Sequence, residues 1–139
     1  MAKSLRPGRR RVVSDGAFEK FAMIEEIRCR LATAIKGTQI RSILLIDFGK
    51  NVYAYWLAAR ELKLNVVAIA DANLARPGRQ YRGIPMVDDS AARALQFDAA
   101  VVANVSPVHS LQRASIWRAM ESRPVIDLYE SNQSQAAAA

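Results

Sequence analysis

Hydrophobic residues follow two different spacings along this chain, and the two spacings alternate. In some segments they recur every three or four residues with polar residues between them, which is the pattern of an amphipathic helix. These segments are residues 17–36, 50–62, 90–96 and 107–122. Other segments are short and apolar throughout, which is typical of a strand buried on both faces. They are residues 41–47, 65–70, 83–87, 98–104 and 124–129.

Residues that break or start regular structure lie at several of these boundaries. Gly37 and Gly49 follow the first helix and the first strand, where a glycine favours a turn. Ser106 and Pro107 are a preferred N-cap and a preferred first residue for the last helix. Pro85 lies inside the third strand, and a proline there favours an edge strand or the start of a strand.

Strands that alternate with helices predict a parallel sheet with helices on both faces. Crossover connections between parallel strands are right-handed, so we expect the strand order 3-2-1-4-5, numbered along the chain. The predicted fold class is therefore α/β, with a doubly wound, mainly parallel, five-stranded sheet and an additional N-terminal helix at residues 17–36.

The composition is that of a single domain. The chain has 139 residues, of which 51% are hydrophobic, enough for one core but not for two domains. No apolar run reaches the roughly 18 to 20 residues of a membrane span, and no apolar segment of a secretory signal follows the N-terminal charges. Cys29 is the only cysteine, so no internal disulfide can form. We therefore expect a cytoplasmic protein.

The net charge of +7 is concentrated at the N-terminus. Residues 1–11 contain five of the 20 basic residues and none of the 13 acidic ones, so the other 15 basic residues nearly balance the acids. We expect a disordered basic tail at residues 1–14, a folded domain at 15–130 and a disordered tail at 131–139. The basic tail is compatible with binding nucleic acid or an anionic membrane surface. It is also compatible with a solubilising extension that has no specific partner.

Ligands of open α/β sheets bind outside the carboxyl ends of the strands, where the strand order reverses. Three loops reach this edge, at residues 47–51, 71–73 and 104–109. In the first loop Gly49 lets a ligand approach the backbone, and the helix start after it favours an anion. Asp71 follows Gly49 by 22 residues, close to the spacing at which a carboxylate binds the hydroxyls of an adenosine ribose. The predicted ligand-binding residues are Gly49, Lys50, Asn51, Asp71, Asn104 and Ser106.

These loop residues also have structural interpretations. A tight turn alone would explain Gly49, and a helix cap or a surface charge would explain Asp71. Asp47 lies in the same first turn, and its carboxylate would repel a pyrophosphate by a few kcal/mol in a poorly solvated cleft.

The acidic turn at residues 71–73, Gly78, and the strands at 83–87 and 98–103 form a characteristic series. With them, residues 43–104 resemble the Rossmann-like N-terminal domain of bacterial polysaccharide-biosynthesis proteins, such as sugar acetyltransferases and nucleotide-sugar-modifying dehydratases. Similar patterns occur in CoA-binding domains and in sugar methyltransferases. The resemblance implies a bound nucleotide, with NAD(P) or a nucleotide-sugar as ligand, and a role in surface-polysaccharide biosynthesis.

The first loop departs from the pattern of that family. The family has G-x-G-x-x-G there, and this chain has Asp47 and Val52 in place of the first and third glycines. The first glycine permits the tight turn, and the third lets helix and strand pack closely. We therefore expect the standard pyrophosphate binding to be lost or altered. A UDP-sugar, an acyl-CoA or a smaller phosphate needs one close backbone approach, which Gly49 still offers.

The sequence assigns no catalytic residue and no metal ligands. His109, the only histidine, has no acidic residue at a short spacing with which to form a catalytic pair, and Cys29 is isolated. Asp88 and Asp89 are adjacent and point apart, which favours a helix cap over an acid/base pair.

Aromatic residues indicate an interface. Tyr53 and Trp56 lie one helical turn apart in the helix at 50–62, and the long N-terminal helix has a wider apolar stripe than a small sheet needs. We therefore expect a homodimer. The sequence as a whole predicts a stand-alone nucleotide-binding module. The alternatives are a protein-interaction or scaffold domain with a degenerate cofactor site, and nucleic-acid binding through the basic tail.

Overall fold

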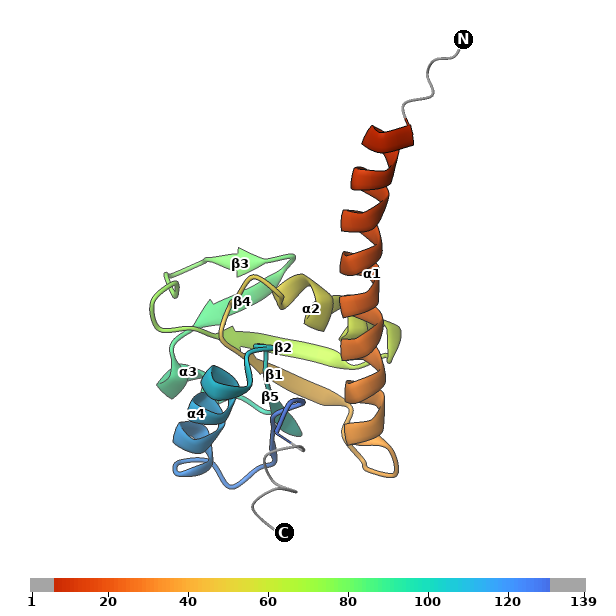
Figure 1. Ribbon diagram of the computed structural model, residues 1–139. Coiled ribbons are helices and arrows are strands. Elements are labelled where there is room, and N and C mark those ends of the chain that lie inside the picture. The colour runs from red at the N-terminus through yellow and green to blue at the C-terminus, as the bar shows by residue number, and fades with distance from the viewer. Residues whose placement is uncertain (1–6, 131–139) are drawn as a thin grey trace.

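The structure is a computed structural model that describes residues 7–130 (Figure 1). Within this range the helices are α1 (Pro7–Ile35), α2 (Val52–Glu61), α3 (Asp89–Arg93) and α4 (Pro107–Arg118). The strands are β1 (Ser42–Ile46), β2 (Asn65–Ala70), β3 (Gln80–Tyr81), β4 (Ile84–Val87), β5 (Ala99–Val102) and β6 (Val125–Ile126). Residues 1–6 of the predicted basic tail and the whole predicted C-terminal tail lie outside the described residues.

The described strands form one mixed, mostly parallel sheet in the order β3-β4-β2-β1-β5-β6. The five strands that the sequence predicts lie in the expected order, each parallel to its neighbour. The prediction of five strands is wrong, because β3 adds a sixth that pairs antiparallel with β4. Arg82 and Gly83 connect the two with φ values of 51° and 84°, which suit a two-residue hairpin turn. A strand of two residues leaves no alternation to recognise in the sequence.

Pro85 lies in β4 rather than at the edge of the sheet. Successive backbone N–H groups of a strand point to opposite sides, and the N–H of Met86 donates to Arg79 O beside β3 at 3.0 Å. The backbone nitrogen of Pro85, which carries no hydrogen, therefore points toward β2. Pairing with β2 begins only at Met86, opposite Ile69, so the proline removes no hydrogen bond from this ladder. This agrees with the expected place for a proline, at the start of a strand.

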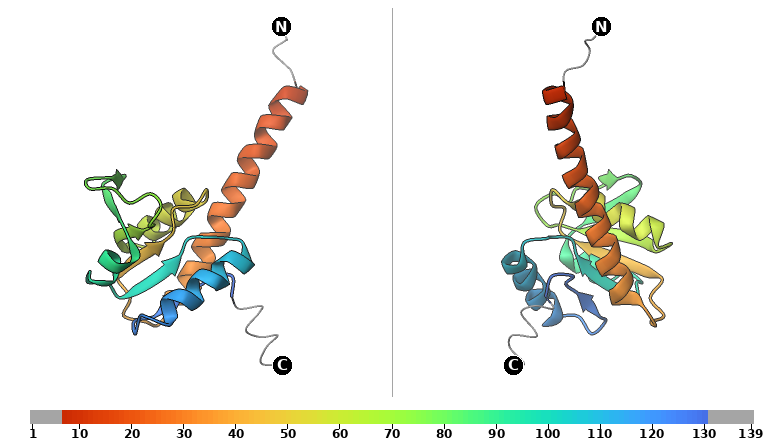
Figure 2. Two further views of the ribbon diagram at one scale, coloured as in Figure 1. Left: turned by 90° about the vertical axis from the view of Figure 1, so that its left-hand side faces the viewer. Right: turned by 45° about the vertical axis from the view of Figure 1, so that its right-hand side comes forward.

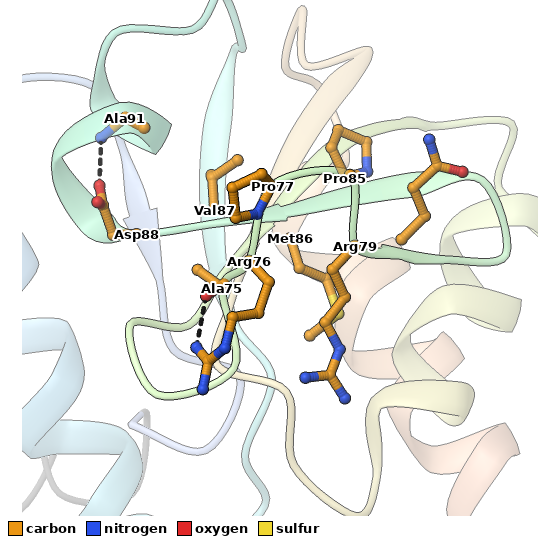
Figure 3. A pocket seen from close by; sticks show the side chains of 11 residues that line it. Ala75, Arg76, Pro77, Arg79, Pro85, Met86, Val87, Asp88 and Ala91 are labelled. Atoms are coloured by element: carbon orange, nitrogen blue, oxygen red, sulfur yellow. Dashed lines mark hydrogen bonds between the residues drawn. The ribbon is translucent and has the colours of Figure 1, made fainter.

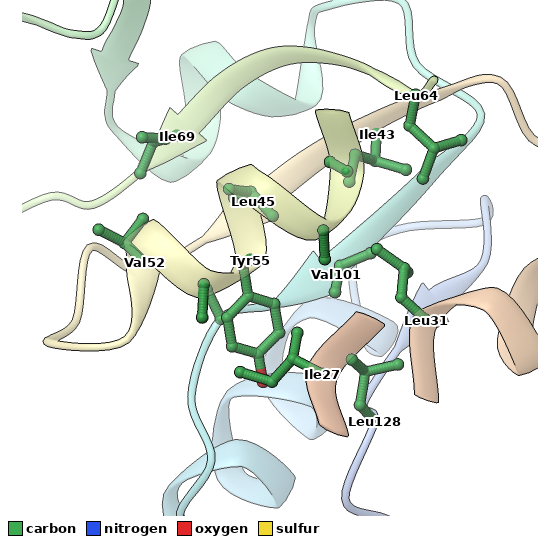
Figure 4. Close-up of a cluster of buried hydrophobic side chains, with 14 of the residues drawn as sticks. Ile27, Leu31, Ile43, Leu45, Val52, Tyr55, Leu64, Ile69, Val101 and Leu128 are labelled. Carbon is green, nitrogen blue, oxygen red and sulfur yellow. The ribbon is translucent and has the colours of Figure 1, made fainter. Parts of the chain in front are cut away.

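Helices cover both faces of the sheet because alternate strand residues point to opposite sides. On one face α1 and α2 pack on the sheet, and Ile27, Tyr55 and Leu45 lie in their shared core (Figure 4). The helices α3 and α4 lie on the other face (Figure 2). Their Ala92 and Trp117 belong to a second core cluster with residues of β1 and its neighbours. All the side chains named here are fully buried.

The N-terminal helix begins at Pro7, ten residues before the predicted start at residue 17. Proline is favoured in the first turn of a helix, and arginine has a high helix propensity, so the basic segment continues the helix. Residues 7–14, assigned from sequence to a disordered tail, are therefore helical. The N-terminal half of α1 projects beyond the sheet (Figures 1 and 2). Its Phe18 and Phe21 are 71% and 61% exposed.

Regular structure also ends earlier than predicted near the C-terminus. The helix α4 stops at Arg118 rather than at residue 122, and β6 contains two residues instead of the predicted six. The strand ends because the chain turns at Asp127, whose carbonyl oxygen accepts from Glu130 N at 3.2 Å. Among the described helices, none has the continuous apolar length that a membrane crossing requires.

Candidate functional site: the carboxyl edge of the sheet

The loops that follow β1, β2 and β5 meet at the carboxyl edge of the sheet, as the sequence predicts. Backbone hydrogen bonds continue the pairing past the strand ends. Asp47 N donates to Ala70 O at 2.8 Å, and Ala103 N donates to Ile46 O at 2.9 Å. Because these bonds join three neighbouring strand ends, the polar residues just beyond them are held close together.

Asp71 joins two of these loops. Its Oδ2 accepts a hydrogen bond from Phe48 N in the first loop at 2.9 Å. Its Oδ1 accepts from Asn73 N and Leu74 N, at 3.0 and 3.2 Å, in the turn that it begins. Each carboxylate oxygen has two lone-pair sites, so room for a ribose hydroxyl remains. The position of Asp71 is nevertheless set by the protein backbone, and it acts as a structural cap.

Three charged side chains form an ion cluster at the same edge. Arg113, from α4, donates from Nε to both carboxylate oxygens of Asp47 at 3.0 Å. The Nη2 atom of Arg113 lies 3.3 Å from the carboxylate of Asp89, the first residue of α3. Each of the three side chains is 25% exposed. The ion cluster therefore links the end of β1 to both helices of one face.

Burial and charge determine the protonation of this ion cluster. Burial raises the pKa of the Asp47 carboxyl, and the attraction of Arg113 does not fully offset it. For Arg113, burial lowers the pKa, but the carboxylates of Asp47 and Asp89 outweigh this effect and raise it. Arg113 stays charged, and two carboxylates surround its one positive charge. The ion cluster does not attract an additional anion.

In the first loop, the left-handed backbone conformation lies at Asp47 and not at the glycine, Gly49. Asp47 has a φ of 76°, the left-handed conformation that glycine adopts easily and aspartate tolerates. An added Cβ at Gly49 would lie 3.5 Å from Ala103 O, an ordinary contact. The close neighbour of Gly49 is thus the end of β5.

Lys50 and Asn51 directly precede α2. Lys50 is exposed, and Asn51 is the N-cap residue, although its side chain makes no capping hydrogen bond. The carbonyl of Asn51 accepts from Ala54 N at 3.0 Å. These two residues lie just before the first turn of α2, at the carboxyl edge of the sheet, and their role in ligand binding stays a prediction.

The third loop is organised by its own side chains. Asn104 Oδ1 accepts from Ser106 N at 2.8 Å, which closes a tight turn. Ser106 is the N-cap residue of α4 and Pro107 follows it, but the serine hydroxyl makes no capping hydrogen bond. His109 is exposed on the first turn of the helix.

Asp88 and Asp89 have different roles. Asp88 caps α3, because its Oδ1 accepts from Ala91 N at 2.8 Å. This confirms the prediction of a helix cap. Asp89 instead belongs to the ion cluster, a contact with Arg113 that no local sequence pattern indicates.

A pocket of about 330 Å³ lies beside the end of β4, and we call it the edge pocket (Figure 3). Residues 75–80, after β2, form one wall, and the other comes from β4 and the start of α3. Pro77, Met86 and Val87 give it an apolar lining, and Arg76 and Arg79 add positive charge. Asn73, Pro77 and Gly78 predict a loop at residues 71–82, and Gly78 adopts a turn conformation there, with a φ of 79°. No sequence pattern indicates a pocket.

A buried polar group lies on the α4 side of the sheet. Ser110 Oγ donates to Asp127 Oδ1, which also accepts from Tyr129 N at 3.0 Å. Among the described atoms, neither Asp127 Oδ2 nor the Tyr55 hydroxyl has a hydrogen-bond partner, although both are buried. Burial is also the main reason why the pKa of Tyr55 is raised.

Comparison with known proteins does not extend these observations, because no family model, no curated protein and no solved structure matches this chain. The assignment to a polysaccharide-biosynthesis family therefore stays a prediction. Within residues 7–130, no three His, Cys, Asp or Glu side chains are grouped closely enough to hold a metal ion.

Proposed function

We propose that the protein is a Rossmann-like module that binds a nucleotide or a nucleotide-sugar at the carboxyl edge of its sheet. The observation that carries this proposal is the edge pocket beside the end of β4. Doubly wound sheets with the order 3-2-1-4-5 bind ligands outside the carboxyl ends of their strands, at the point between β1 and β5 where the order reverses. The edge pocket shares this edge of the sheet but lies at the end of β4, two strands from that point, and none of the six predicted ligand-binding residues lines it. The helices on both faces and the observed strand order support that class of fold.

The chemistry of the edge pocket suits a nucleoside with attached phosphate. Its volume of about 330 Å³ falls within the range of small-ligand sites. The apolar side chains of Pro77, Met86 and Val87 would contact a base, and Arg76 and Arg79 would attract phosphate. Both arginines donate to carbonyl oxygens of their own loop: Arg76 Nη1 to Ala75 O at 2.7 Å and to Asn73 O at 3.4 Å, and Arg79 Nη1 to Leu74 O at 3.3 Å. Their other donors remain for a ligand.

A dinucleotide in the standard Rossmann pose is a poorer fit than a nucleotide-sugar in the edge pocket. Both ligands contain a pyrophosphate, but the standard pose carries it past the first turn, where the ion cluster places the carboxylates of Asp47 and Asp89 around a single guanidinium. A phosphate next to this net negative charge is repelled. The ligand class we propose therefore keeps its phosphates near Arg76 and Arg79 and away from Asp47. A role in surface-polysaccharide biosynthesis is part of this proposal and rests on the resemblance of residues 43–104.

A thermal-shift panel tests the proposal with a UDP-sugar, NAD, NADP, an acyl-CoA and S-adenosylmethionine. A ligand at 100 times its dissociation constant stabilises the folded state by about 2.7 kcal/mol, and we expect that shift with the UDP-sugar. Ala91→Phe places a ring in the edge pocket from an exposed position and should abolish the shift. Ala94→Phe, at the other end of α3 and outside the pocket lining, is the matched control. A UDP-sugar shift that survives Ala91→Phe contradicts the edge pocket as the site.

A second pair of variants asks whether Asp47 is what disfavours a dinucleotide. Asp47→Gly removes the carboxylate from a residue with φ 76° and should raise the affinity for NAD by roughly 1 to 2 kcal/mol. Asp47→Asn removes the charge but keeps a side chain, so comparing the two separates charge from shape. Titration calorimetry with NAD measures both. No gain with either variant means that Asp47 serves only the turn and the ion cluster.

A second candidate function is a protein-interaction domain whose cofactor site has degenerated. It is favoured by the ion cluster, which places protein side chains at the first-turn position. It is also favoured by Phe18 and Phe21, exposed on the projecting half of α1. No thermal shift with any ligand of the panel, together with self-association or capture of a protein partner through α1, would support this candidate over the first.

A further inference from the structure

Five side chains form what we call the arginine–aromatic surface. Tyr53, Trp56 and Arg60 lie on α2, and Tyr81 and Arg82 lie in the β3–β4 hairpin. The rings of Tyr53 and Trp56 are stacked, with centroids 5.7 Å apart and 29° between their planes. The guanidinium carbon of Arg82 lies 5.0 Å from the centre of Tyr53 and 4.6 Å from that of Trp56. Arg60 lies over Trp56 at 5.4 Å.

The hairpin turn holds Arg82 in this position. Arg82 has a φ of 51°, followed by Gly83 at 84°, so the turn directs the chain back beside α2. Its Nε also donates to the hydroxyl of Tyr81 at 3.2 Å. The guanidinium is therefore placed by backbone geometry as well as by the rings. An exposed arginine that is held in this way loses less side-chain freedom when it binds a ligand.

A hollow of about 500 Å³ borders the arginine–aromatic surface. Trp56, Arg60 and Lys63 line it from α2 and the turn after it, and Asn65 lines it from the start of β2. None of the described residues that line the hollow is acidic. The nearest acid along the helix is Glu61, which lies 3.7 Å from Arg28 of α1 in an ion pair. The hollow is therefore bordered by positive charge and by an aromatic face.

We propose that the arginine–aromatic surface binds single-stranded nucleic acid. Bases stack on aromatic rings and on guanidinium planes, and Tyr53, 41% exposed, offers an accessible ring next to the plane of Arg82. Arg60 and Lys63 lie within reach of the phosphates that follow such a base. Among the described residues, cationic side chains and no acidic one line the hollow, and the rings beside it are stacked. These two features match a polymer that has planar bases and negatively charged phosphates.

An acidic peptide matches only half of this arrangement. It would bind the arginines and Lys63 by charge but would leave the planar stack of Tyr53 and Trp56 without a role. The hollow lies at the amino edge of the sheet, where β2 and β4 begin, and the arginine–aromatic surface extends from it along α2 to Tyr53, near the start of that helix. None of the five residues of this surface lines the edge pocket, so this inference does not depend on the proposed nucleotide site.

The experiment uses the full chain and a fluorescein-labelled 12-mer of deoxythymidine, with anisotropy as the readout. Tyr53→Ala and Arg82→Ala should each weaken binding by about 5- to 100-fold, the effect of losing one stacked base. Tyr53→Phe keeps the ring and should bind within about twofold of the natural chain. Arg93→Ala removes an arginine from α3, on the opposite face of the sheet, and should leave binding unchanged.

Tryptophan fluorescence gives an independent readout with an unlabelled 12-mer. The chain has two tryptophans, and Trp117 is completely buried. A base that stacks at the arginine–aromatic surface therefore quenches Trp56 alone. We expect quenching that saturates at the same concentration as the anisotropy change and that Tyr53→Ala shifts to higher concentration.

Two further measurements test competing explanations, namely binding by the N-terminal segment and recognition of charge alone. Arg9→Gln/Arg10→Gln/Arg11→Gln lowers the charge of the N-terminal segment. If this variant abolishes binding while Tyr53→Ala and Arg82→Ala do not weaken it, the N-terminal segment is the binding site and the proposal is overturned. Competition with poly-glutamate tests the second explanation. If it displaces the 12-mer at equal charge concentration, the surface recognises charge alone, as it would in an acidic protein partner. That result, or the absence of quenching, also overturns the proposal.

Discussion

At the scale of single residues, Asp47 rather than Gly49 takes the left-handed conformation in the first loop. Asp47 adopts the left-handed conformation, with a φ of 76°, whereas Gly49 does not have a positive φ. Aspartate is one of the few residue types that tolerates this conformation, and the pairing with Arg113 holds it there. Asp47 therefore supplies the left-handed position of this turn without a glycine.

The backbone conformations predict different effects for two glycine-to-alanine changes. Gly49→Ala should leave stability unchanged or raise it by about 0.5 kcal/mol, because the new Cβ makes an ordinary contact and the unfolded chain loses freedom. Gly83→Ala should lower stability by about 1 kcal/mol, because its φ is 84°. Urea unfolding of both variants measures the difference. A loss of more than about 1 kcal/mol for Gly49→Ala would show that the turn needs glycine.

The two tyrosine hydroxyls near α1 predict opposite results for the same substitution. The Tyr55 hydroxyl is buried without a described partner, so Tyr55→Phe should stabilise the protein by about 1 kcal/mol. The Tyr129 hydroxyl donates to Glu26 Oε2 at 2.6 Å, so Tyr129→Phe should destabilise it by about 1 kcal/mol. Chemical denaturation compares the two. A destabilised Tyr55→Phe protein would mean that this hydroxyl hydrogen-bonds in solution.

At the scale of elements, a single carboxylate sets how β5 begins beside β1. Asp98 Oδ2 accepts from Arg41 N at 2.8 Å and from Ser42 N at 3.0 Å. Asp98 N donates back to Ser42 Oγ at 3.1 Å. The apolar runs of the two strands predict that they are buried, but these polar contacts determine which residues of the pair stand opposite each other.

Asp98 also predicts a dependence of stability on pH. The hydrogen bonds from Arg41 N and Ser42 N lower its pKa below the ordinary value of 3.8. A lowered pKa contributes stability that is present above the unfolded value and is lost as the pH falls through the folded value. Asp98→Asn should therefore lower the urea midpoint at pH 7, and the difference should shrink as the pH falls below about 4.

The control for this prediction is Glu19→Gln, which removes an exposed carboxylate on α1. Its unfolding curves should follow those of the natural chain at each pH. Equal midpoints for Asp98→Asn and the natural chain at pH 7 would show that the carboxylate does not hold the two strand starts.

At the scale of the whole molecule, the projecting half of α1 is the main feature that the sheet leaves uncovered. Phe18 and Phe21 are exposed there by 71% and 61%. Large apolar side chains that cluster on a helix beyond its own domain are typical of an interface. We expect a second copy of the chain to cover them, through two α1 helices that pack together.

Light scattering checks this expectation at about 100 micromolar protein, well above the dissociation constant of a standard-sized interface. The natural chain should have the mass of a dimer, and Phe18→Glu/Phe21→Glu should have the mass of a monomer. Val108→Glu, at a side chain of α4 that is 60% exposed, should remain a dimer. A monomeric natural chain would rule the dimer out.

The sequence by itself determined the class of the fold and the order of its main strands. Apolar spacing is a local property, and β2 (Asn65–Ala70) has the same bounds as the strand predicted from its apolar run. The handedness of crossovers then leaves few orders for five parallel strands. Gly49, Lys50, Asn51, Asp71, Asn104 and Ser106 were placed at the carboxyl edge for the same reason, since parallel strands end on one side.

Only the tertiary structure decided what those residues contact. Asp71 binds Phe48 N across 23 positions, and Asp47 pairs with Arg113 across 66. Contacts over such distances depend on how helices pack, which no local spacing encodes. The edge pocket and the arginine–aromatic surface arise in the same way, because the short β3–β4 hairpin brings residues 75–82 against other elements. The hydrophobic pattern sets which faces are buried, and packing sets which polar groups meet.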